Sequence, residues 1–241
     1  MKKISIVIPA YNEEEYIIST LERVIKSDTL GLSKEIIIVD DASQDNTVNR
    51  LKAYTSSLRI NSRQCSIRVI LKKKNAGKGA ALRTGFLVST GDIVLIQDAD
   101  LEYDPGEYPI LLEPFLNHDA DVVYGSRFVS YRPHRVLYFW HYVANICLTT
   151  LSNMLTNLNL TDMETGFKVF KGDIIRGLAP QLQSQRFGFE PEITARLSKI
   201  EGIKIFEVGV SYWGRTYEEG KKIGWKDGVR AVAEIIKYNL F

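Results

Sequence analysis

Cysteine is scarce in this sequence, and its scarcity excludes two kinds of structural crosslink. The 241 residues contain only Cys65 and Cys147, which lie far apart and lack the CxxC or histidine spacing of a zinc site. A disulfide framework and a structural zinc ion are therefore not expected, and a reducing cytoplasm suits the chain. Residues 1–8 also lack the apolar stretch and cleavage site of a signal peptide, so the chain is expected to remain in the cytoplasm.

Charge of one sign is not in large excess either. The formal net charge is +2, which is too small to indicate a nucleic-acid partner, and none is expected. Hydrophobic residues make up 45% of the chain and charged residues 25%, as in an ordinary globular protein. No linker, repeat or low-complexity segment divides the sequence, so residues 1–241 are predicted to form one domain.

Glycine-rich phosphate motifs are missing as well. The segment 75–79 (NAGKG) would need glycine in place of Lys72 and serine or threonine in place of Gly79 to be a P-loop. The turn after the first predicted strand contains no glycine, which excludes the dinucleotide fingerprint. Nucleotidyltransferases on similar sheets usually have a glycine-rich loop at that turn, so its absence favours transfer from an already activated sugar.

Short β-branched runs alternate with segments of helical periodicity along the first half of the chain. The expected strands are residues 4–8, 35–39, 67–71, 92–96 and 120–124, and the expected helices are residues 13–26, 46–56 and 78–89. This alternation predicts an α/β fold with a parallel sheet covered by helices. Ligands of such sheets bind beyond the carboxyl ends of the strands, so candidate site residues are sought there.

Two aspartates directly after the fourth strand are the sharpest candidate site. Asp98 and Asp100 are two residues apart, so an irregular backbone can turn both carboxylates toward one point. Mg²⁺ and Mn²⁺ take one or two protein carboxylates and complete their shells with water and phosphate oxygens, which makes a diphosphate the natural partner. Two aspartates that cap a turn are the alternative, but the position at a strand end favours a metal.

Acidic residues also follow the first and second strands. One carboxylate of Asp40 and Asp41 is placed to accept hydrogen bonds from a base or ribose, and the other would cap the helix that begins near Asp45. The turn from Pro9 to Glu13 has a plain structural interpretation too, because acidic residues in the first turn of a helix are favoured by its dipole. Neither feature indicates function by itself.

Taken in order, these motifs resemble family 2 glycosyltransferases, particularly the dolichyl- or polyprenyl-phosphate mannosyl- and glucosyltransferase branch. The matching segments are residues 5–14, 39–43, 75–79, 98–100, 125–127, 161–168 and 188–190. The resemblance implies a GT-A fold, which is Rossmann-like, with a mostly parallel central sheet flanked by helices. It also implies a nucleotide-sugar-binding half, residues 1–125, and an acceptor-binding half, residues 126–241.

The resemblance assigns the donor site to residues of the first half. It implies that Pro9, Tyr11 and Glu13 hold the nucleotide base and ribose, aided by Asp40, and that Lys78 lies in the nucleotide cleft.

The metal motif implied by the resemblance is Asp98 and Asp100, which would bind Mg²⁺ or Mn²⁺. The residue two positions further on is often glutamine in this branch, but here it is Glu102, which adds a negative charge beside the metal.

Basic residues of the second half are predicted to neutralise phosphate groups. The resemblance selects Arg127, together with Arg215 and Lys221 in the late loop that closes over the donor, as catalytic groups alongside Asp100. The weaker candidates are Arg132, Arg135 and Lys222.

The predicted reaction is transfer of a hexose, with inversion, from a UDP- or GDP-sugar such as UDP-glucose or GDP-mannose to polyprenyl phosphate. A phosphate acceptor is already anionic and needs no general base. The first alternative, transfer to a saccharide hydroxyl, would need Asp162, Glu190 or Glu192 as the base, and Asp162 is expected to lie nearest the acceptor. The second alternative is a nucleotide-sugar-binding module without turnover.

Residues 136–156 form a long apolar segment with aromatic residues at one end. Polar residues such as His141 and Asn145 interrupt it, so it is not expected to span a bilayer, which takes about 20 predominantly apolar residues. It is predicted to lie peripherally at the cytoplasmic face of the membrane, where a polyprenyl tail stays in lipid while its phosphate enters the cleft. Packing on the domain or in a homodimer is the alternative.

Overall fold

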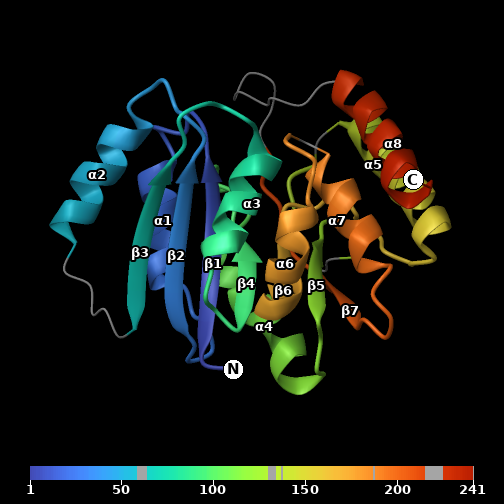
Figure 1. Cartoon of the computed structure of the whole chain (residues 1–241), viewed down its shortest axis with the longest axis horizontal. Coiled ribbons are helices and arrows are strands. Elements are labelled where there is room, and N and C mark those ends of the chain that lie inside the picture. Colours follow the sequence, from blue (N-terminus) through green and yellow to red (C-terminus); the bar gives the residue numbers. More distant parts are fainter. Residues whose placement is uncertain (59–63, 130–133, 137, 187, 215–224, 241) are drawn as a thin grey trace.

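The computed structural model describes residues 1–58, 64–129, 134–136, 138–186, 188–214 and 225–240, and a seven-stranded sheet lies at its centre (Figure 1). The strand order is β3-β2-β1-β4-β6-β5-β7. The strands are β1 (Lys3–Ala10), β2 (Ser33–Asp40), β3 (Cys65–Leu71), β4 (Ile93–Ile96), β5 (Val122–Ser126), β6 (Lys168–Lys171) and β7 (Ile205–Gly209).

The sheet is mostly parallel, with one reversed strand. β1 pairs in parallel with β2 and β4, β2 with β3, and β5 with β7. β6 lies between β4 and β5 and runs antiparallel to both. The predicted α/β fold with a mostly parallel central sheet is therefore confirmed.

Two hydrophobic cores cover the two faces of the sheet, and this explains why the central strands are almost continuously apolar. In β1, Ile6 belongs to the core on one face, and Val7 belongs to the core on the other. Ile36 and Ile37 of β2 alternate in the same way, and all four side chains are fully buried. A strand buried on both faces reads as an apolar run because successive side chains point to opposite sides.

Helices supply the other half of each core. α1 and α4 pack on one face, and α3, α6 and α7 pack on the other, in front of the sheet in Figure 1. The helices are α1 (Ile17–Lys26), α2 (Thr47–Ser57), α3 (Lys78–Val88), α4 (Tyr108–Asn117), α5 (Phe139–Thr156), α6 (Gly172–Leu178), α7 (Phe189–Leu197) and α8 (Trp225–Leu240), with short 3₁₀ helices η1 (Pro105–Glu107) and η2 (Ala179–Gln181).

Some boundaries differ from the sequence prediction for physical reasons. The first helix begins at Ile17 rather than at Glu13, because Asn12 adopts a left-handed conformation (φ 52°) and the next residues form turns. β6 and β7 were not predicted, since each is short: β6 has only two apolar residues, flanked by Lys168 and Lys171, and Glu207 interrupts the apolar residues of β7.

The apolar segment at 136–156 corresponds largely to α5. Its second half packs inward, where Thr149 and Ser152 are buried, whereas Phe139 and Trp140 at its start are 66% and 76% exposed. α8 and α7 contact it. Among the helices of the described residues, none is long and apolar enough to cross a membrane.

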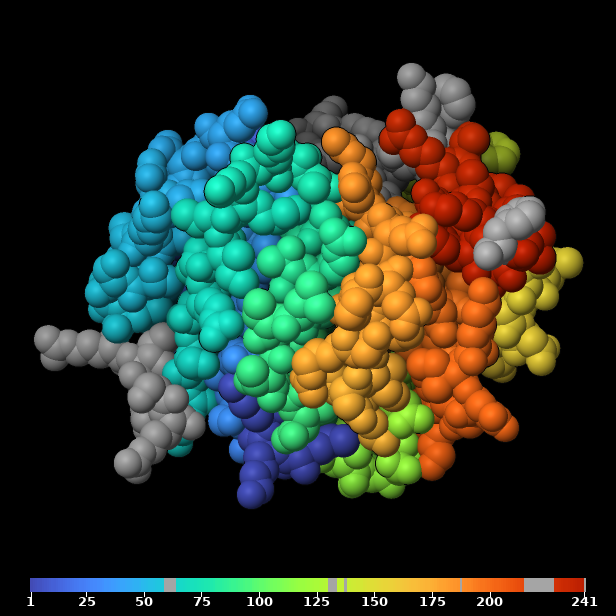
Figure 2. Space-filling view, viewed as in Figure 1, coloured from blue at the N-terminus to red at the C-terminus, as the bar shows by residue number. Residues whose placement is uncertain are grey.

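The two halves of the chain meet along the sheet and its front helices. Figure 2 shows the earlier residues, in blue to green, against the later residues, in orange to red, with α3 beside α6. A Cβ at Gly79 would lie 2.4 Å from the carbonyl oxygen of Ser184, so the start of α3 can approach the later chain this closely only because glycine stands there.

Candidate active site

The site lies where β1, β2, β4 and β5 end, at the edge of the sheet opposite the N-terminus (Figure 1). Parallel strands present their carboxyl ends at one edge, so the segments that follow them converge. β6 runs the other way, and the loop of residues 161–167 that precedes it therefore reaches the same edge.

Lys78 connects the donor-side residues through two ion pairs. Its Nζ lies 2.9 Å from Oδ1 of Asp98, which follows β4, and 3.3 Å from Oε1 of Glu190 on α7. Burial alone would lower the pKa of Lys78, but the charges of Asp98 and Glu190 raise that pKa above its usual range. Lys78 is therefore a fixed cation that lies directly on the predicted metal aspartate.

Gly166 lets the loop of residues 161–167 pack directly against Asp98. A Cβ at this position would lie 2.3 Å from Oδ2 of Asp98 and 2.8 Å from Cε2 of Tyr103. The backbone N–H of Gly166 donates to the hydroxyl of Tyr103 at 2.9 Å. Any larger residue would push the loop away from the aspartate.

Asp100 and Glu102 lie in the turn after Asp98. The backbone N–H of Glu102 donates to Oδ1 of Asp100 at 3.2 Å, and the hydroxyl of Tyr212 donates to Oε2 of Glu102 at 2.8 Å. Within the described residues, no group of three or more His, Cys, Asp or Glu is gathered for a metal ion. An all-oxygen pair such as Asp98 and Asp100 fits Mg²⁺ or Mn²⁺, which use one or two carboxylates together with phosphate oxygens.

Arg127 and Asp162 form a second, buried ion pair. Nε and Nη2 of Arg127 donate to the two carboxylate oxygens at 2.6 and 2.7 Å, and the backbone N–H of Arg127 adds a third bond at 3.0 Å. Burial would lower the pKa of Arg127, but Asp162 raises that pKa well above its usual range. The rings of Phe128 and Tyr212 lie 5.5 and 5.2 Å from the guanidinium carbon. Two residues that were predicted as separate catalytic groups therefore form one unit.

Lys168 and Glu164 are site residues that the sequence interpretation missed. The fully buried Lys168 donates to the carbonyl oxygens of Met163 and Thr165, which fixes the loop, and lies 4.9 Å from the centre of the Tyr124 ring. Burial lowers the pKa of Lys168 to about 8, and burial together with the charge of Glu190 raises the pKa of Glu164 to about 8. Both residues lie close to Asp162 within residues 161–168, a segment that resembles the family, and this position was the sequence signal that could have identified them.

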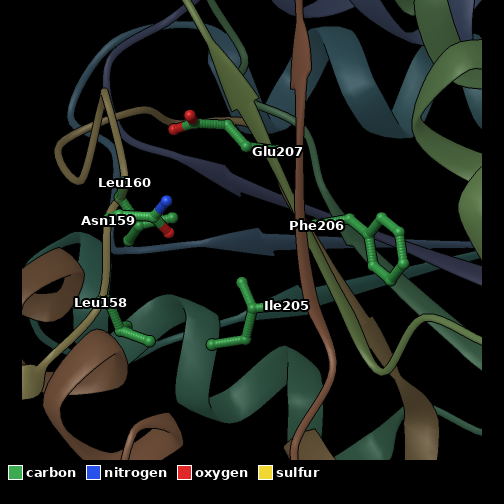
Figure 3. A pocket seen from close by; sticks show the side chains of 6 residues that line it. All are labelled: Leu158, Asn159, Leu160, Ile205, Phe206 and Glu207. Carbon is green, nitrogen blue, oxygen red and sulfur yellow. The ribbon is translucent and has the colours of Figure 1, made fainter.

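Glu207 of β7 anchors the start of the same loop. Its carboxylate accepts hydrogen bonds from the backbone N–H groups of Thr161 and Asp162 at 2.9 and 3.2 Å, and from the hydroxyl of Thr161 at 2.8 Å. Beside it is a small pocket of about 180 Å³, into which Ile205 also faces, while Phe206 points to the other side of the strand (Figure 3). The pocket lies at the base of the loop, away from Asp98.

The two aspartates after β2 have structural partners. Asp40 accepts hydrogen bonds from the backbone N–H and the hydroxyl of Ser43 at 3.0 and 2.5 Å. Asp41 does not cap α2, contrary to the capping interpretation: it accepts from the backbone N–H groups of Ala76 and Gly77 and pairs with Lys72. The N-cap residue of α2 is Asn46, and the carboxylate of Asp45 just before it accepts from the backbone N–H of Thr47.

The turn after β1 lies against the start of α2. Pro9 is at the carboxyl end of β1, and Pro9, Tyr11 and Glu13 are all half-buried. The backbone N–H of Glu13 donates to the hydroxyl of Thr47 at 2.9 Å, which ties the turn to the helix. These residues therefore lie at the same edge of the sheet as Asp40, as the resemblance implies.

The late basic loop, residues 215–221, lies outside the described residues, together with its Arg215 and Lys221. Arg132 and Lys222 also lie outside them. The chain leading to it is well anchored. The backbone N–H of Trp213 donates to the carbonyl oxygen of Glu102 at 3.0 Å, and Nη1 of Arg135 donates to the carbonyl oxygen of Gly214 at 3.2 Å. The residues just before the loop are thus held beside the metal motif.

The fold and the chemistry of this edge together define a GT-A glycosyltransferase. Residues 5–178 match the model of the family described as glycosyl transferase family 2, and the chain belongs to that family.

Curated relatives extend the similarity over nearly the whole chain. A dolichyl-phosphate beta-glucosyltransferase of Dictyostelium discoideum is 28% identical over 97% of this chain and 73% of its own length. An undecaprenyl-phosphate mannosyltransferase of Micrococcus luteus is 28% identical over 97% of this chain and 93% of its own. A dolichol-phosphate mannosyltransferase of Pyrococcus furiosus is 27% identical over 92% of this chain and 60% of its own.

Solved structures support the fold. Glucosyl-3-phosphoglycerate synthase from Mycobacterium tuberculosis, in complex with Mn²⁺, UDP and phosphoglyceric acid, superposes with a TM-score of 0.72 at 20% identity, covering 100% of this chain and 79% of that one. The same enzyme has also been solved with Mg²⁺ and UDP, with a TM-score of 0.68 at 21% identity, covering 99% of this chain and 79% of that one.

Proposed function

We propose that this chain transfers a hexose, with inversion, from a UDP- or GDP-sugar to polyprenyl phosphate. The observation that carries the proposal is that one loop joins two charged centres: Asp162 binds Arg127, and Gly166 packs against Asp98. A donor diphosphate at Asp98 and an acceptor phosphate at Arg127 would lie on either side of this loop. The relatives named as dolichyl- or undecaprenyl-phosphate sugar transferases support the lipid phosphate as acceptor.

The donor diphosphate would be bound by Asp98, Asp100 and Lys78. Mg²⁺ or Mn²⁺, held by the two aspartates, would supply positive charge to the departing nucleoside diphosphate. Lys78 already lies against Asp98, so its ammonium is placed to contact a phosphate oxygen next to the metal. Glu102 would add a further carboxylate beside the metal, held in position by the hydrogen bond from Tyr212 to its Oε2.

The nucleoside would lie over the ends of β1 and β2. Pro9, Tyr11 and Glu13 would contact the base and ribose, with Asp40 beside them. In this assignment, residues 1–125 form the donor half and residues 126–241 the acceptor half.

The acceptor phosphate would be neutralised by Arg127, together with Arg215 and Lys221 of the late loop. All three carboxylates considered as a base for a hydroxyl acceptor are already in ion pairs: Asp162 with Arg127, Glu190 with Lys78, and Glu192 with Arg196. Each of these carboxylates is therefore already bound by a cation, whereas a phosphate acceptor needs no general base. This arrangement favours the lipid phosphate over a saccharide hydroxyl.

The start of α5 would contact the cytoplasmic face of the membrane. The ring of Phe128, next to Arg127, lies edge-on to Tyr142 with 5.3 Å between ring centres, and the exposed Phe139 and Trp140 precede Tyr142 on the same helix. Aromatic side chains thus lead from the buried arginine toward an apolar surface. Exposed aromatic groups suit the membrane interface, where a polyprenyl tail would remain in lipid. A homodimer through this surface is the alternative.

The test is transfer of radiolabelled sugar from UDP-glucose and GDP-mannose to polyprenyl phosphate in the presence of Mn²⁺ or Mg²⁺. The native chain is compared with Asp100→Asn and with Asp173→Asn, an exposed aspartate at the start of α6. We expect label in the lipid phase for the native chain and for Asp173→Asn, and a loss of about a hundredfold or more for Asp100→Asn.

Two other results would change the proposal. Metal-dependent donor hydrolysis without a lipid product would move the acceptor to a saccharide. A native chain that binds neither donor would overturn the proposed function as a whole.

A further inference from the structure

Glu164 lies in the middle of the loop that joins the two charged centres. Two residues before it, Asp162 binds Arg127, and two residues after it, Gly166 packs against Asp98. Glu190, which pairs with Lys78, is close enough to Glu164 to raise its pKa. The side chain therefore lies near Arg127 and Asp162 on one side and near Glu190, the partner of Lys78, on the other.

The Glu164 carboxyl group differs from its neighbours because one of its oxygens has no hydrogen-bond partner among the described residues. Its Oε1 is buried and makes no hydrogen bond within the described residues, although the residue as a whole is partly exposed. Asp98, Asp162 and Glu190 around it are all ion-paired. An unsatisfied buried polar atom destabilises a protein, so a ligand that reaches the partly exposed Glu164 and supplies the missing hydrogen bond would stabilise the site.

The chemistry of the carboxyl group narrows the kind of ligand. Burial and then Glu190 raise the pKa of Glu164 to about 8, so the group holds a proton through most of the neutral range. A protonated carboxyl donates one hydrogen bond and accepts others, and an ionised one only accepts. A hydroxyl group suits both forms because it is donor and acceptor at once, whereas a phosphate oxygen suits only the protonated form.

We propose that Glu164 binds a hydroxyl group of the hexose while it is transferred. This inference rests on the proposed function, because only a hexosyl donor places hydroxyl groups between a diphosphate at Asp98 and an acceptor at Arg127. Glu164 is then a sugar-specificity residue, distinct from the groups that hold the nucleotide and the metal.

The test separates the sugar from the nucleotide. Dissociation constants are measured with Mn²⁺ for UDP and UDP-glucose and for GDP and GDP-mannose, using the native chain, Glu164→Leu, Glu164→Gln and the exposed control Glu201→Gln. We expect Glu164→Leu to weaken binding of the preferred nucleotide sugar about tenfold or more and to leave the free nucleotide unchanged. Glutamine can still donate and accept, so Glu164→Gln should remain within a few-fold of the native chain in both binding and turnover.

A series of deoxy-sugar donors supplies a second test, whose first measurement uses the native chain alone. Removal of one particular hydroxyl should weaken binding to the native chain about tenfold, and removal of the same hydroxyl should have little effect on Glu164→Leu.

Several outcomes would overturn the inference. These are equal weakening of nucleotide and nucleotide sugar by Glu164→Leu, no weakening of either, or a deoxy series without a single sensitive hydroxyl. Normal donor binding by Glu164→Gln with loss of turnover would make Glu164 a general base instead. If the native chain binds no nucleotide sugar, the proposed function itself fails, and this result is distinct from all the others.

Discussion

The two ion pairs of the site are built differently. Lys78 and Asp98, on the donor side, meet through one ammonium, and their side chains are 21% and 19% exposed. Arg127 and Asp162, on the acceptor side, meet through two parallel hydrogen bonds, and their side chains are 14% and 0% exposed. A pair held by one ammonium, which lies 2.9 and 3.1 Å from the two oxygens of Asp98, can exchange its partner for a metal ion or phosphate, whereas a buried bidentate pair holds its geometry. The donor side is thus arranged to change partners and the acceptor side to stay fixed.

The largest expected contrast is in stability. Arg127→Met leaves the buried Asp162 carboxylate without its partner and should lower the free energy of unfolding by about 3–5 kcal/mol. Lys78→Met leaves the partly solvated Asp98 and the buried Glu190 without their shared cation and should cost less, about 1–3 kcal/mol. Urea unfolding of both variants measures the two values, and similar losses would contradict the comparison. The double variant Arg127→Met with Asp162→Leu should regain most of the stability but not the transferase activity.

A smaller effect is expected at Gly166, where the loop of residues 161–167 contacts Asp98 of the Lys78–Asp98 pair. In Gly166→Ala, the new Cβ would meet Oδ2 of Asp98, so metal-dependent donor binding should weaken about tenfold, with about 1–3 kcal/mol lost in stability. Gly177→Ala on α6 is the matched control, because its Cβ meets nothing within 4 Å. That variant should be neutral or up to about 1 kcal/mol more stable. Calorimetric donor binding and thermal unfolding of both variants provide the measurement, and unchanged donor binding by Gly166→Ala would argue against the contact.

The loop should also give the protein a pH-dependent stability. Burial, then Glu190, raises the pKa of Glu164 from 4.5 to about 8, so between these values the folded protein keeps a proton that the unfolded chain has lost. Stability contributed by this group is therefore lost as pH rises from about 5 to 8. The charged groups facing it are Lys168, Arg127, Asp162 and Glu190.

Glu164→Gln removes this titration, so its stability relative to the native chain should increase over that range by up to about 3 kcal/mol. Denaturant unfolding at pH 5, 6, 7 and 8 measures the difference, with Glu201→Gln as the exposed control. A constant difference between native and Glu164→Gln would mean that Glu164 titrates normally. Above pH 8 the slope should reverse, because burial lowers the pKa of Lys168 from 10.5 to about 8.

The smallest effect is expected at the surface, outside both pairs. Trp140→Ser on α5 should reduce sedimentation of the protein with anionic lipid vesicles a few-fold, since one exposed aromatic side chain contributes only part of a membrane contact. Leu116→Ser, which removes an exposed apolar residue of α4 on the other face of the sheet, should leave vesicle binding unchanged. Equal binding by all three proteins would favour the homodimer for the α5 surface.

The sequence predicted the strand cores and the residues that follow them, because runs such as Ile36 to Val39 have few other structures available in a chain of this kind. It did not predict how the site residues pair. Arg127 and Asp162 are 35 positions apart, and only the reversed strand β6 brings them together. Asp41 likewise binds the backbone at Ala76 instead of the helix that follows it, which local capping rules cannot anticipate. Glu164 lies in a segment that resembles the family, but its own importance lies in an oxygen without a hydrogen-bond partner among the described residues, which only packing reveals.

The reversed strand has a consequence for how enzymes of this architecture can change. β5 and β6 are antiparallel neighbours, with Tyr124 opposite Lys168, so the chain leaves the sheet after β5 and returns beside the point of departure. Residues 127–167 therefore form one excursion whose two ends are fixed by adjacent strands, and it carries Arg127, Glu164 and the apolar start of α5. Such an excursion can be exchanged as one segment while residues 1–125, the proposed donor half, keep their sequence. Transplantation of this segment, or recombination between relatives, offers a direct route to new acceptors.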